Sequence, residues 1–389
     1  MKLLYVLPDL GLGGVQKVAS EIGREQAKQG HDVHFLLLQD KQTIDIDYPA
    51  KVSHLRKRQL FIHNPLWAVY YVFYKIILRK LLPHSEAFWA EPLFRRLANS
   101  KVCELEAECR FDAIYLRGIR VIKHMHTLEH SNVVFSLHLP LRWLDVPRNM
   151  AITQWIAWLH RRIFMDRNIF FVSTEISDGF LRQCEKAGTK LRQHQVINNP
   201  CIIERIRTLG SAQLEYQHPF FLNVSRLTRQ KRIDILIEAF AMLDTGHHLV
   251  IVGDGSLKPQ LKRLSGRLGI SDRVLFYGKD TNPYRWMTKA TAFVLSSDTE
   301  GFPNVLLEAL ACGAPLISTR CEGASDILSG RLARGLVDRR DIPALAKKMK
   351  EYVSNPEKPS AADAERFDIK RCSEKYIKAA LIGYTAPEN

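Results

Sequence analysis

Two glutamates eight positions apart, Glu300 and Glu308, bracket a turn and the start of a helix. Pro303 suits the first helical position and Gly313 suits the left-handed residue after the last turn, so the sequence predicts a helix over residues 303–312. Because nearly all of its residues are apolar or small, we expect this helix to be buried. A buried carboxylate costs several kcal/mol unless donors meet it. Either Glu308 pairs with a core arginine, or it accepts two hydrogen bonds from a ligand diol.

Glu300 itself lies just before this helix, in a loop that offers backbone donors. We expect the N–H groups of Gly301, Phe302 and Asn304 to point at an anion or an oxygen-rich ligand, because the first N–H groups of a helix lack partners within it. The stretch therefore predicts a binding site.

A basic turn precedes a second helix. Arg226 and Lys231 lie in the turn 225–231, and apolar residues at helical spacing mark a helix over 233–243. Cations at the positive end of a helix are unfavourable, by roughly a few tenths of a kcal/mol, unless an anion lies between them. Arg226 and Lys231 therefore predict a phosphate site.

Glycine turns follow two predicted strands. Gly13 and Gly14 open a helix after the strand 3–7, and Gly253 follows the strand 249–252. A phosphate can approach the backbone at such a place, although tight packing of strand against helix needs the same glycines. The first turn matches neither the dinucleotide fingerprint nor the Walker loop. His138 ends the predicted strand 133–137, where it either faces a ligand crevice or is structural.

Alternating strands and helices predict an α/β protein with two parallel sheets, each covered by helices on both faces. The length of 389 residues allows two domains. We expect a first Rossmann-like domain over 1–200, a linker over 201–218 and a second Rossmann-like domain over 219–370. A last helix within 371–389 is expected to pack back on the first domain.

Composition narrows the class of protein and its partners. With 46% hydrophobic and 25% charged residues, neither a disordered chain nor a multispan membrane protein fits. The net charge of +15 favours an anionic partner. Seven cysteines without a C-x-x-C pair indicate reduced thiols in a cytoplasmic protein, and the apolar run at 3–7 is too short for a signal peptide. The pair Asp45 and Asp47 is a weak cation-binding pattern.

Residues 48–85 contain no acidic side chain and several basic ones. The apolar run within 66–82 is shorter than a spanning helix requires, so it predicts a helix lying in the membrane plane, with aromatic residues at the headgroups and cations on anionic lipid. A helix buried against the sheet is the alternative. The candidate membrane or acceptor residues are Trp67, Tyr70, Tyr71, Lys75, Arg79 and Lys80.

With these motifs in view, the chain resembles the retaining GT-B-fold glycosyltransferases of family four, glycosyl transferases group 1, of the bacterial surface-glycan type. The resemblance rests on Gly-Gly-Val-Gln-Lys at 13–17, Val-Ser-Arg-Leu-Thr-Arg-Gln-Lys at 224–231, Val-Gly-Asp-Gly at 252–255 and the E-x7-E stretch at 300–308. It implies two Rossmann-like domains that face each other across a cleft. The first would bind the acceptor and the second a nucleotide sugar.

The resemblance also implies a role for each candidate residue. Glu308 would bind the ribose hydroxyls, and Arg226 and Lys231 would hold the diphosphate of the donor. Glu300 would hold the donor sugar, with His138 beside it. The donor-binding set is Gly13, Gly14, Gly253, Gly301, Phe302, Pro303, Asn304, Val305 and Glu308. Asp326 departs from the glutamate that the family often has after the last strand.

The expected activity is retaining transfer of a hexose or N-acetylhexosamine from a nucleotide diphosphate sugar, with UDP favoured, to a surface polysaccharide or lipid-linked oligosaccharide. No cofactor or metal is expected, because side-chain charges and helix amides would do the work of a cation. We expect a cytoplasmic protein on the inner face of the membrane, without nucleic acid. Two alternatives remain: a nucleotide-sugar epimerase, which would form an isomer from donor alone, and a basic nucleic-acid-binding module, which would bind generic strands in a salt-dependent way.

Overall fold

The computed structural model describes residues 1–11, 13–55, 65–78, 84, 86–107, 109–145 and 149–382. The chain folds into two compact units, the first made of 1–198 with 370–389 and the second of 199–369. The first boundary lies close to the expected one at 200. The expected linker over 201–218 is wrong, because Ile203–Gly210 forms helix α9, which packs on two helices of the second unit.

The described part of the first unit contains a seven-stranded parallel sheet in the order β3-β2-β1-β4-β5-β6-β7. Its inner strands are mostly apolar, and β1 contains the unbroken apolar run Leu-Leu-Tyr-Val-Leu, because both faces of a parallel sheet are buried. The strands are β1 (Lys2–Leu7), β2 (Asp32–Leu37), β3 (Ala50–His54), β4 (Ala113–Arg117), β5 (Val133–Leu137), β6 (Asn168–Phe171) and β7 (Gln193–Val196).

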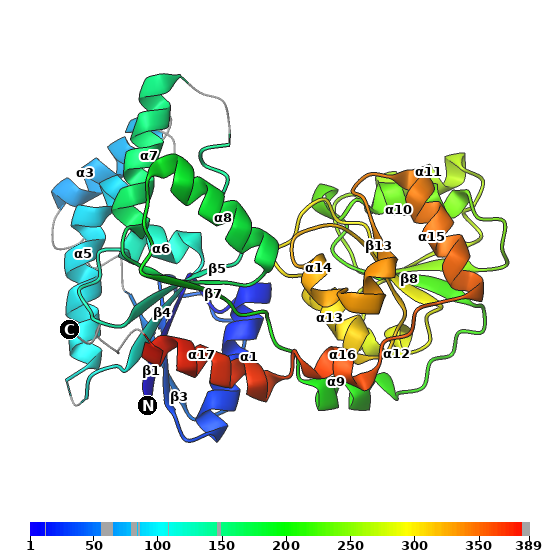
Figure 1. Ribbon diagram of the computed structural model, residues 1–389, viewed down its shortest axis with the longest axis horizontal. Helices are drawn as coiled ribbons and strands as arrows, with labels where there is room; N and C mark the ends of the chain where they lie inside the picture. The colour runs from blue at the N-terminus through cyan, green and yellow to red at the C-terminus, as the bar shows by residue number, and fades with distance from the viewer. Residues whose placement is uncertain are drawn as a thin grey trace. The chain divides into compact units, whose positions relative to one another are not determined.

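Helices cover both faces of this sheet, and the last one comes from the C-terminus. They are α1 (Gly14–Lys28), α3 (Pro65–Phe73), the π-helical η1 (Tyr74–Leu78), α5 (Glu86–Leu105), α6 (Ile119–Met125), α7 (Met150–Phe164), α8 (Thr174–Ala187) and α17 (Ile369–Ile382). Helix α17, red in Figure 1, lies beside the blue α1, and Ser373 Oγ donates to Gln29 Oε1 at the end of α1. Tyr376 of α17 packs on the rings of Tyr115 and Phe170 on the sheet.

The described part of the second unit contains a six-stranded parallel sheet in the order β10-β9-β8-β11-β12-β13. The strands are β8 (Phe220–Val224), β9 (His248–Val252), β10 (Val274–Gly278), β11 (Ala292–Leu295), β12 (Leu316–Thr319) and β13 (Leu336–Val337). The helices are α9, η2 (Arg229–Lys231), α10 (Ile233–Ala241), α11 (Lys258–Arg267), α12 (Tyr284–Met287), α13 (Asn304–Ala311), α14 (Ala324–Ile327), η3 (Gly330–Gly335), α15 (Ile342–Ser354) and α16 (Ala361–Glu365).

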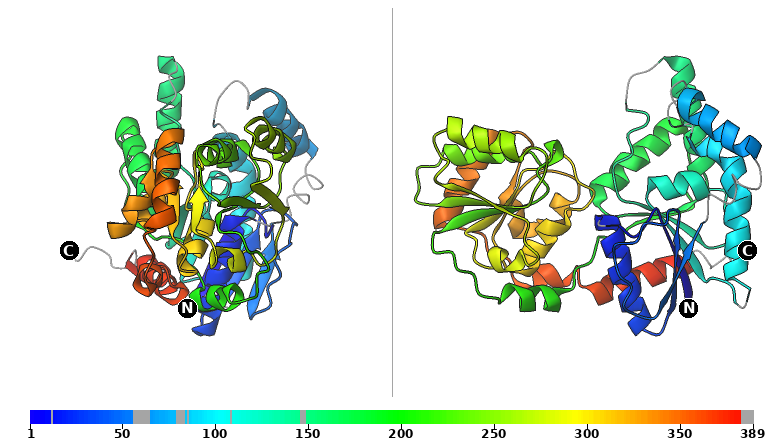
Figure 2. Two further views of the ribbon diagram at one scale, coloured as in Figure 1. Left: turned by 90° about the vertical axis from the view of Figure 1, so that its right-hand side faces the viewer. Right: turned by 180° about the vertical axis from the view of Figure 1, so that it is seen from behind.

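The helices of the second unit form two layers. Helix α10 packs on α11 and α15, whereas α13 packs on α9, α12 and α16. Figure 1 shows these two groups with the strands between them, and Figure 2 shows the same layering from behind. The apolar core joins α10 and α15 to the sheet, with Phe240, Val294 and Tyr352 fully buried. The carboxyl ends of the strands are therefore left to loops, and these loops carry the candidate site.

Candidate functional site

The order of the second sheet marks one place for a ligand. β8 is the first strand of this sheet along the chain, and its neighbours are β9 on one side and β11 on the other. The winding of the chain reverses there, and in parallel sheets of this kind the carboxyl ends of the strands at such a point commonly bind ligands. The loop after β8 carries 225–232, and the loop after β11 carries 296–303. These are the two stretches that the sequence analysis singled out.

The two loops meet in an ion pair between Lys231 and Glu300. Lys231 Nζ donates to Glu300 Oε1 at 2.6 Å, and only 13% and 11% of the two side chains are exposed. Backbone contacts hold the loops together: Ser296 Oγ donates to the Lys231 carbonyl at 2.9 Å, and Gln230 Nε2 donates to the Thr299 carbonyl at 2.6 Å. A cation and a carboxylate are thus fixed side by side where the sheet topology predicts a ligand.

Glu322, after β12, supports Glu300 from the other side, and the sequence analysis did not assign it a role. Its Oε2 accepts from the Glu300 N–H at 3.1 Å and from Thr299 Oγ1 at 2.9 Å, and Arg339 Nη2 lies 3.3 Å from Oε1. Burial would raise the pKa of Glu322, but these hydrogen bonds, one from its own backbone N–H and the nearby Arg339 hold it below its ordinary value. Glu322 is therefore a buried, ionised brace for the loop. The signal in the sequence that could have identified Glu322 is the position of a glutamate just after an apolar strand.

Arg226 lies exposed in the loop after β8, and backbone carbonyls at the end of β9 and in the loop after it hold the residues on either side of Arg226. The Ser225 N–H donates to the Val252 carbonyl, and the Leu227 N–H donates to the Asp254 carbonyl, both at 3.0 Å. A Cβ on Gly253, whose φ is +140°, would lie 1.9 Å from the Ser225 oxygen. Gly253 is thus required for close packing of the two loops. This packing fixes the backbone that carries Arg226. Contact between Arg226 and a donor stays a prediction.

Helix α13 carries Glu308 on a half-buried stripe, which corrects the expectation that this carboxylate is buried. Asn304, Glu308 and Cys312 recur at a spacing of four and are partly exposed, whereas the neighbouring leucines and alanines of α13 are buried. The Tyr284 hydroxyl of α12 donates to Glu308 Oε1 at 3.4 Å. The carboxylate therefore points along the accessible side of the helix, where a ligand hydroxyl can reach it.

The start of α13 is packed by its own loop residues. The N-cap is Pro303, so the first turn has no side-chain cap, and Asn304 Oδ1 accepts from Asn199 Nδ2 at 2.8 Å. Phe302 is buried against the ring of Phe367. Gly323, at φ +77°, fits closely because a Cβ there would lie 3.0 Å from the Gly301 oxygen. The side chains of Phe302 and Pro303 are buried and Val305 is half-buried, so backbone amides are what this turn offers a ligand.

The first unit carries the predicted His138, Gly13 and Gly14. His138 follows β5 and is 7% exposed, and its Nε2 is hydrogen-bonded to Ser136 Oγ at 2.9 Å. Burial, with the nearby Arg117, holds the pKa of His138 well below its ordinary value, so the imidazole is neutral at pH 7. Gly13 is the N-cap of α1 and Gly14 its first residue, after the carboxyl end of β1.

The helix expected at the membrane has an exposed face that is apolar and largely aliphatic. Tyr74 is only 6% exposed, and Tyr70 and Tyr71 are half-buried, so these three side chains do not form an open aromatic face; binding of the helix to a membrane stays a prediction. The side chains open to solvent are instead Leu66, Val69, Val72, Phe73, Ile76 and Ile77, with Leu66 76% exposed. Arg79 and Lys80, and the side chains of Trp67 and Lys75, lie outside the described residues. In the described part of the chain, no helix is long and apolar enough to cross a membrane.

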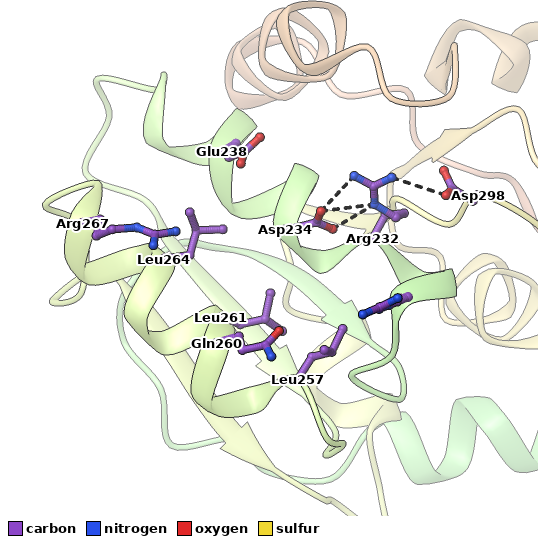
Figure 3. Close-up of a pocket in the computed structure, with 10 residues that line it drawn as sticks. Arg232, Asp234, Glu238, Leu257, Gln260, Leu261, Leu264, Arg267 and Asp298 are labelled. Atoms are coloured by element: carbon purple, nitrogen blue, oxygen red, sulfur yellow. Dashed lines mark hydrogen bonds and ion pairs between the residues drawn. The ribbon is translucent and has the colours of Figure 1, made fainter.

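A cavity of about 530 Å³ lies next to the ion pair, on the side of α10 and α11 (Figure 3). The residues that line it include Arg232 and Asp298, which belong to the two paired loops, and Leu261 of α11. Arg232 donates to both Asp234 oxygens and, through Nη1 at 3.4 Å, to Asp298. Lys231 and Glu300 do not line this cavity, so it is a separate hollow behind the loops.

The described residues include no group of three or more His, Cys, Asp or Glu side chains placed to hold a metal ion. In the weak cation pattern, Asp47 is ion-paired with Arg24 instead. That the reaction needs no metal stays a prediction.

Comparison with known proteins identifies the family. Residues 210–366 match the family described as glycosyl transferases group 1. The lipopolysaccharide 1,6-galactosyltransferase of Escherichia coli is 30% identical over 271 residues, which are 64% of this chain and 75% of that protein. The chain belongs to the glycosyl transferases group 1 family. The prediction of a family-four glycosyltransferase is thereby confirmed at the level of the family.

Another relative of this group 1 chain is also a named glycosyltransferase. A Campylobacter jejuni protein, N-acetylgalactosamine-N,N'-diacetylbacillosaminyl-diphospho-undecaprenol 4-alpha-N-acetylgalactosaminyltransferase, is 31% identical over 193 residues. That match covers 47% of this chain and 53% of the relative, so the chain spans about half the length of that protein.

Solved structures agree on the fold of the group 1 chain. The lipopolysaccharide outer core galactosyltransferase WaaB, in its apo form, matches with a TM-score of 0.67 and 21% identity over 98% of this chain and 99% of that one. Anabaena HepE in complex with UDP and glucose matches with a TM-score of 0.66 and 19% identity over 97% and 98%. The predicted GT-B fold is confirmed.

Proposed function

We propose that this chain is a retaining glycosyltransferase that transfers a hexose or N-acetylhexosamine from a nucleotide diphosphate sugar, with UDP favoured, to a growing surface polysaccharide or lipid-linked oligosaccharide. The observation that carries the proposal is the Lys231–Glu300 pair at the switch point of the second sheet, with Arg226 exposed on the same loop as Lys231. The family and the glycan-building relatives support the same class of reaction.

The chemistry follows from the charges in these loops. A bound diphosphate replaces Glu300 as the partner of Lys231 and also meets Arg226, and both cations offset the charge that develops on the leaving nucleotide. Glu300, released from Lys231 but still braced by Glu322, accepts hydrogen bonds from hydroxyls of the donor sugar. Glu308, on the accessible stripe of α13, accepts from the ribose diol. The transferred sugar then passes through an oxocarbenium-like state on the way to the acceptor.

We further propose that the protein works at the inner face of the cytoplasmic membrane, on an acceptor carried by lipid. The exposed aliphatic face of α3 and η1 supports this, because a soluble protein rarely leaves six large apolar side chains together in water. The basic character of residues 48–85 matches an anionic lipid surface. The occupant of this face is therefore a lipid bilayer in our proposal.

A donor panel tests the proposed reaction. The purified full chain is incubated with a set of UDP- and GDP-sugars, and slow release of the nucleotide is measured without acceptor. We expect release from one or a few UDP-sugars, and retained anomeric configuration in any transfer product. Absence of release from every donor, with correct folding shown by circular dichroism, would count decisively against the proposal.

A further inference from the structure

Two consecutive arginines, far from the ion pair in sequence, hold the loop that presents Glu300. Arg339 and Arg340 lie in the turn after β13, the edge strand of the second sheet. Arg340 donates from Nε and Nη2 to the two oxygens of Asp298, at 3.0 and 2.8 Å. Arg339 places Nη2 3.3 Å from Glu322 Oε1. Each arginine thus meets a different carboxylate.

Both carboxylates are tied directly to the loop of Glu300. Asp298 lies two residues before Glu300, and its N–H donates to the Gln230 carbonyl at 2.9 Å, which links the loop to the turn that carries Lys231. Glu322 accepts the N–H of Glu300 itself. The turn after β13 therefore reaches both sides of Glu300 through one intermediate residue on each side.

Asp298 also contacts a second cation, which comes from the turn that carries Lys231. Arg232 lies between Asp234 and Asp298 in Figure 3, so Asp298 is shared by Arg232 and Arg340. The two arginines adopt left-handed backbone conformations, at φ 48° and φ 62°. Such a conformation is strained for a residue other than glycine. Strain of this kind persists only where the surroundings impose it, and here the ion pairs with Asp298 supply the compensation.

We propose that the Arg339–Arg340 turn is a positioning element of the candidate site, which acts through Asp298 and Glu322 to hold in place the loop that carries the Glu300 carboxylate. The nature of the ligand rests on the proposed function, whereas the mechanical role of the turn does not. A shift of about 1 Å in a positioning group can lower a rate up to a hundredfold. The turn can therefore change the reaction rate without touching the substrate.

The test compares Arg340→Ala, Arg340→Lys and Asp298→Asn with the parent chain. Arg331→Ala is the matched control, because Arg331 is also a partly exposed arginine of the second unit and pairs with two carboxylates, Glu357 and Asp363, away from the Glu300 loop. The first measurement is amide hydrogen exchange of the peptide 296–303. We expect exchange several-fold faster in Arg340→Ala and Asp298→Asn, and unchanged in the control.

The second measurement is nucleotide release from the donor that the parent chain uses. We expect kcat to fall about tenfold in Arg340→Ala, with KM for the donor changed less than about twofold, because Glu308 and Arg226 are untouched. Arg340→Lys should recover part of the loss, since lysine keeps the charge but not the two-pronged contact.

Each outcome decides a separate point. Unchanged exchange in both Arg340→Ala and Asp298→Asn would overturn the positioning role. Faster exchange with unchanged kcat would also overturn it, because the loop would then move without consequence for the reaction. If the parent chain releases nucleotide from no donor, the proposed function fails, and the exchange result alone decides whether the turn holds the loop.

Discussion

Lys231 and Glu300 are 69 residues apart in the chain, yet their side chains form a mostly buried ion pair at 2.6 Å. The pair joins the loop after the first strand of the second sheet to the loop after β11. Breaking a buried pair by removing one partner leaves the other charge uncompensated, which makes each partner sensitive to the loss of the other. A substitution of either partner should therefore affect the structure of both loops.

Replacement of Lys231 should abolish most of the activity. We expect Lys231→Ala to lower kcat/KM for the donor by at least about a hundredfold, because it removes a cation from the leaving diphosphate. Donor release and transfer are the measurements. Arg229→Ala is the control, since Arg229 lies in the same turn but is exposed. A similar loss in both variants would show that general positive charge, rather than Lys231, matters.

Glu308 should govern the affinity for the nucleotide. Loss of one hydrogen bond to a charged group costs about 1.5–3 kcal/mol, so we expect Glu308→Ala to weaken UDP binding by at least about ten- to a hundredfold in calorimetry. Glu238→Ala, on the half-buried side of α10, should leave UDP binding unchanged. Glu300→Ala should spare UDP binding and impair use of the sugar. If Glu308→Ala binds UDP as tightly as the parent, the assignment is wrong.

Gly253 should be intolerant of any side chain. A Cβ 1.9 Å from the Ser225 oxygen, at φ +140°, forces the two loops apart. We expect Gly253→Ala to destabilise the protein by about 2–4 kcal/mol in urea unfolding. Gly246→Ala is the control, because nothing lies within 4 Å of a Cβ there. Equal midpoints for the two variants would contradict the packing role.

Buried histidines should make the first unit sensitive to acid. Burial lowers the pKa of His126 to about 4, and burial together with the nearby Arg161 lowers that of His160 to about 4. Since the unfolded state binds these protons near pH 6.5, stability should fall as the pH drops from about 6.5 toward 4, by up to about 3 kcal/mol for each histidine. Below pH 4 these two groups add no further loss.

The measurement for this acid effect is urea unfolding at several pH values. His160→Phe should flatten the dependence between pH 6.5 and 4, whereas His194→Phe, on an exposed strand residue, should not. An unchanged slope in His160→Phe would mean that other groups cause the loss.

The aliphatic face of α3 and η1 should bind lipid. We expect the parent chain to float with vesicles that contain anionic lipid, and Leu66→Glu with Val69→Glu to reduce the bound fraction at least tenfold, because each charge opposes burial of the face. Met242→Glu places a charge at another exposed apolar residue and should have no effect. Equal flotation of all three proteins would exclude this face.

Local patterns were enough to predict the fold and the loops of the site. Buried parallel strands are continuous apolar runs, so β1, β5 and β8 could be found, and Pro303 and Gly313 bounded α13 within a residue or two. The edge strand β3 could not, since its sequence Ala-Lys-Val-Ser-His is half exposed and resembles a loop. Helix α5 was missed because its apolar residues show little periodicity and Pro92 interrupts them.

The parts of the site that depend on contacts between residues far apart in the chain could not be predicted from the sequence. The charges of Arg226 and Lys231 indicated an anion, but nothing in the sequence indicated that Glu300 would be the partner of Lys231. Glu308 was expected to be buried because its helix is apolar, whereas the stripe at spacing four leaves it accessible. Glu322 depends on a hydrogen bond from a backbone N–H 22 residues earlier, which no side-chain pattern encodes.

The first unit is completed by the last helix of the chain. Tyr376 lies over Tyr115 and Phe170, its hydroxyl accepts from the fully buried Arg117, and Tyr115 donates to its carbonyl. During synthesis, residues 1–198 leave the ribosome long before 370–382 exist. One face of the first sheet, with a guanidinium and several aromatic rings, therefore stays uncovered until residues 370–382 have been synthesised. The first unit can thus complete its core only after the whole second unit has been synthesised.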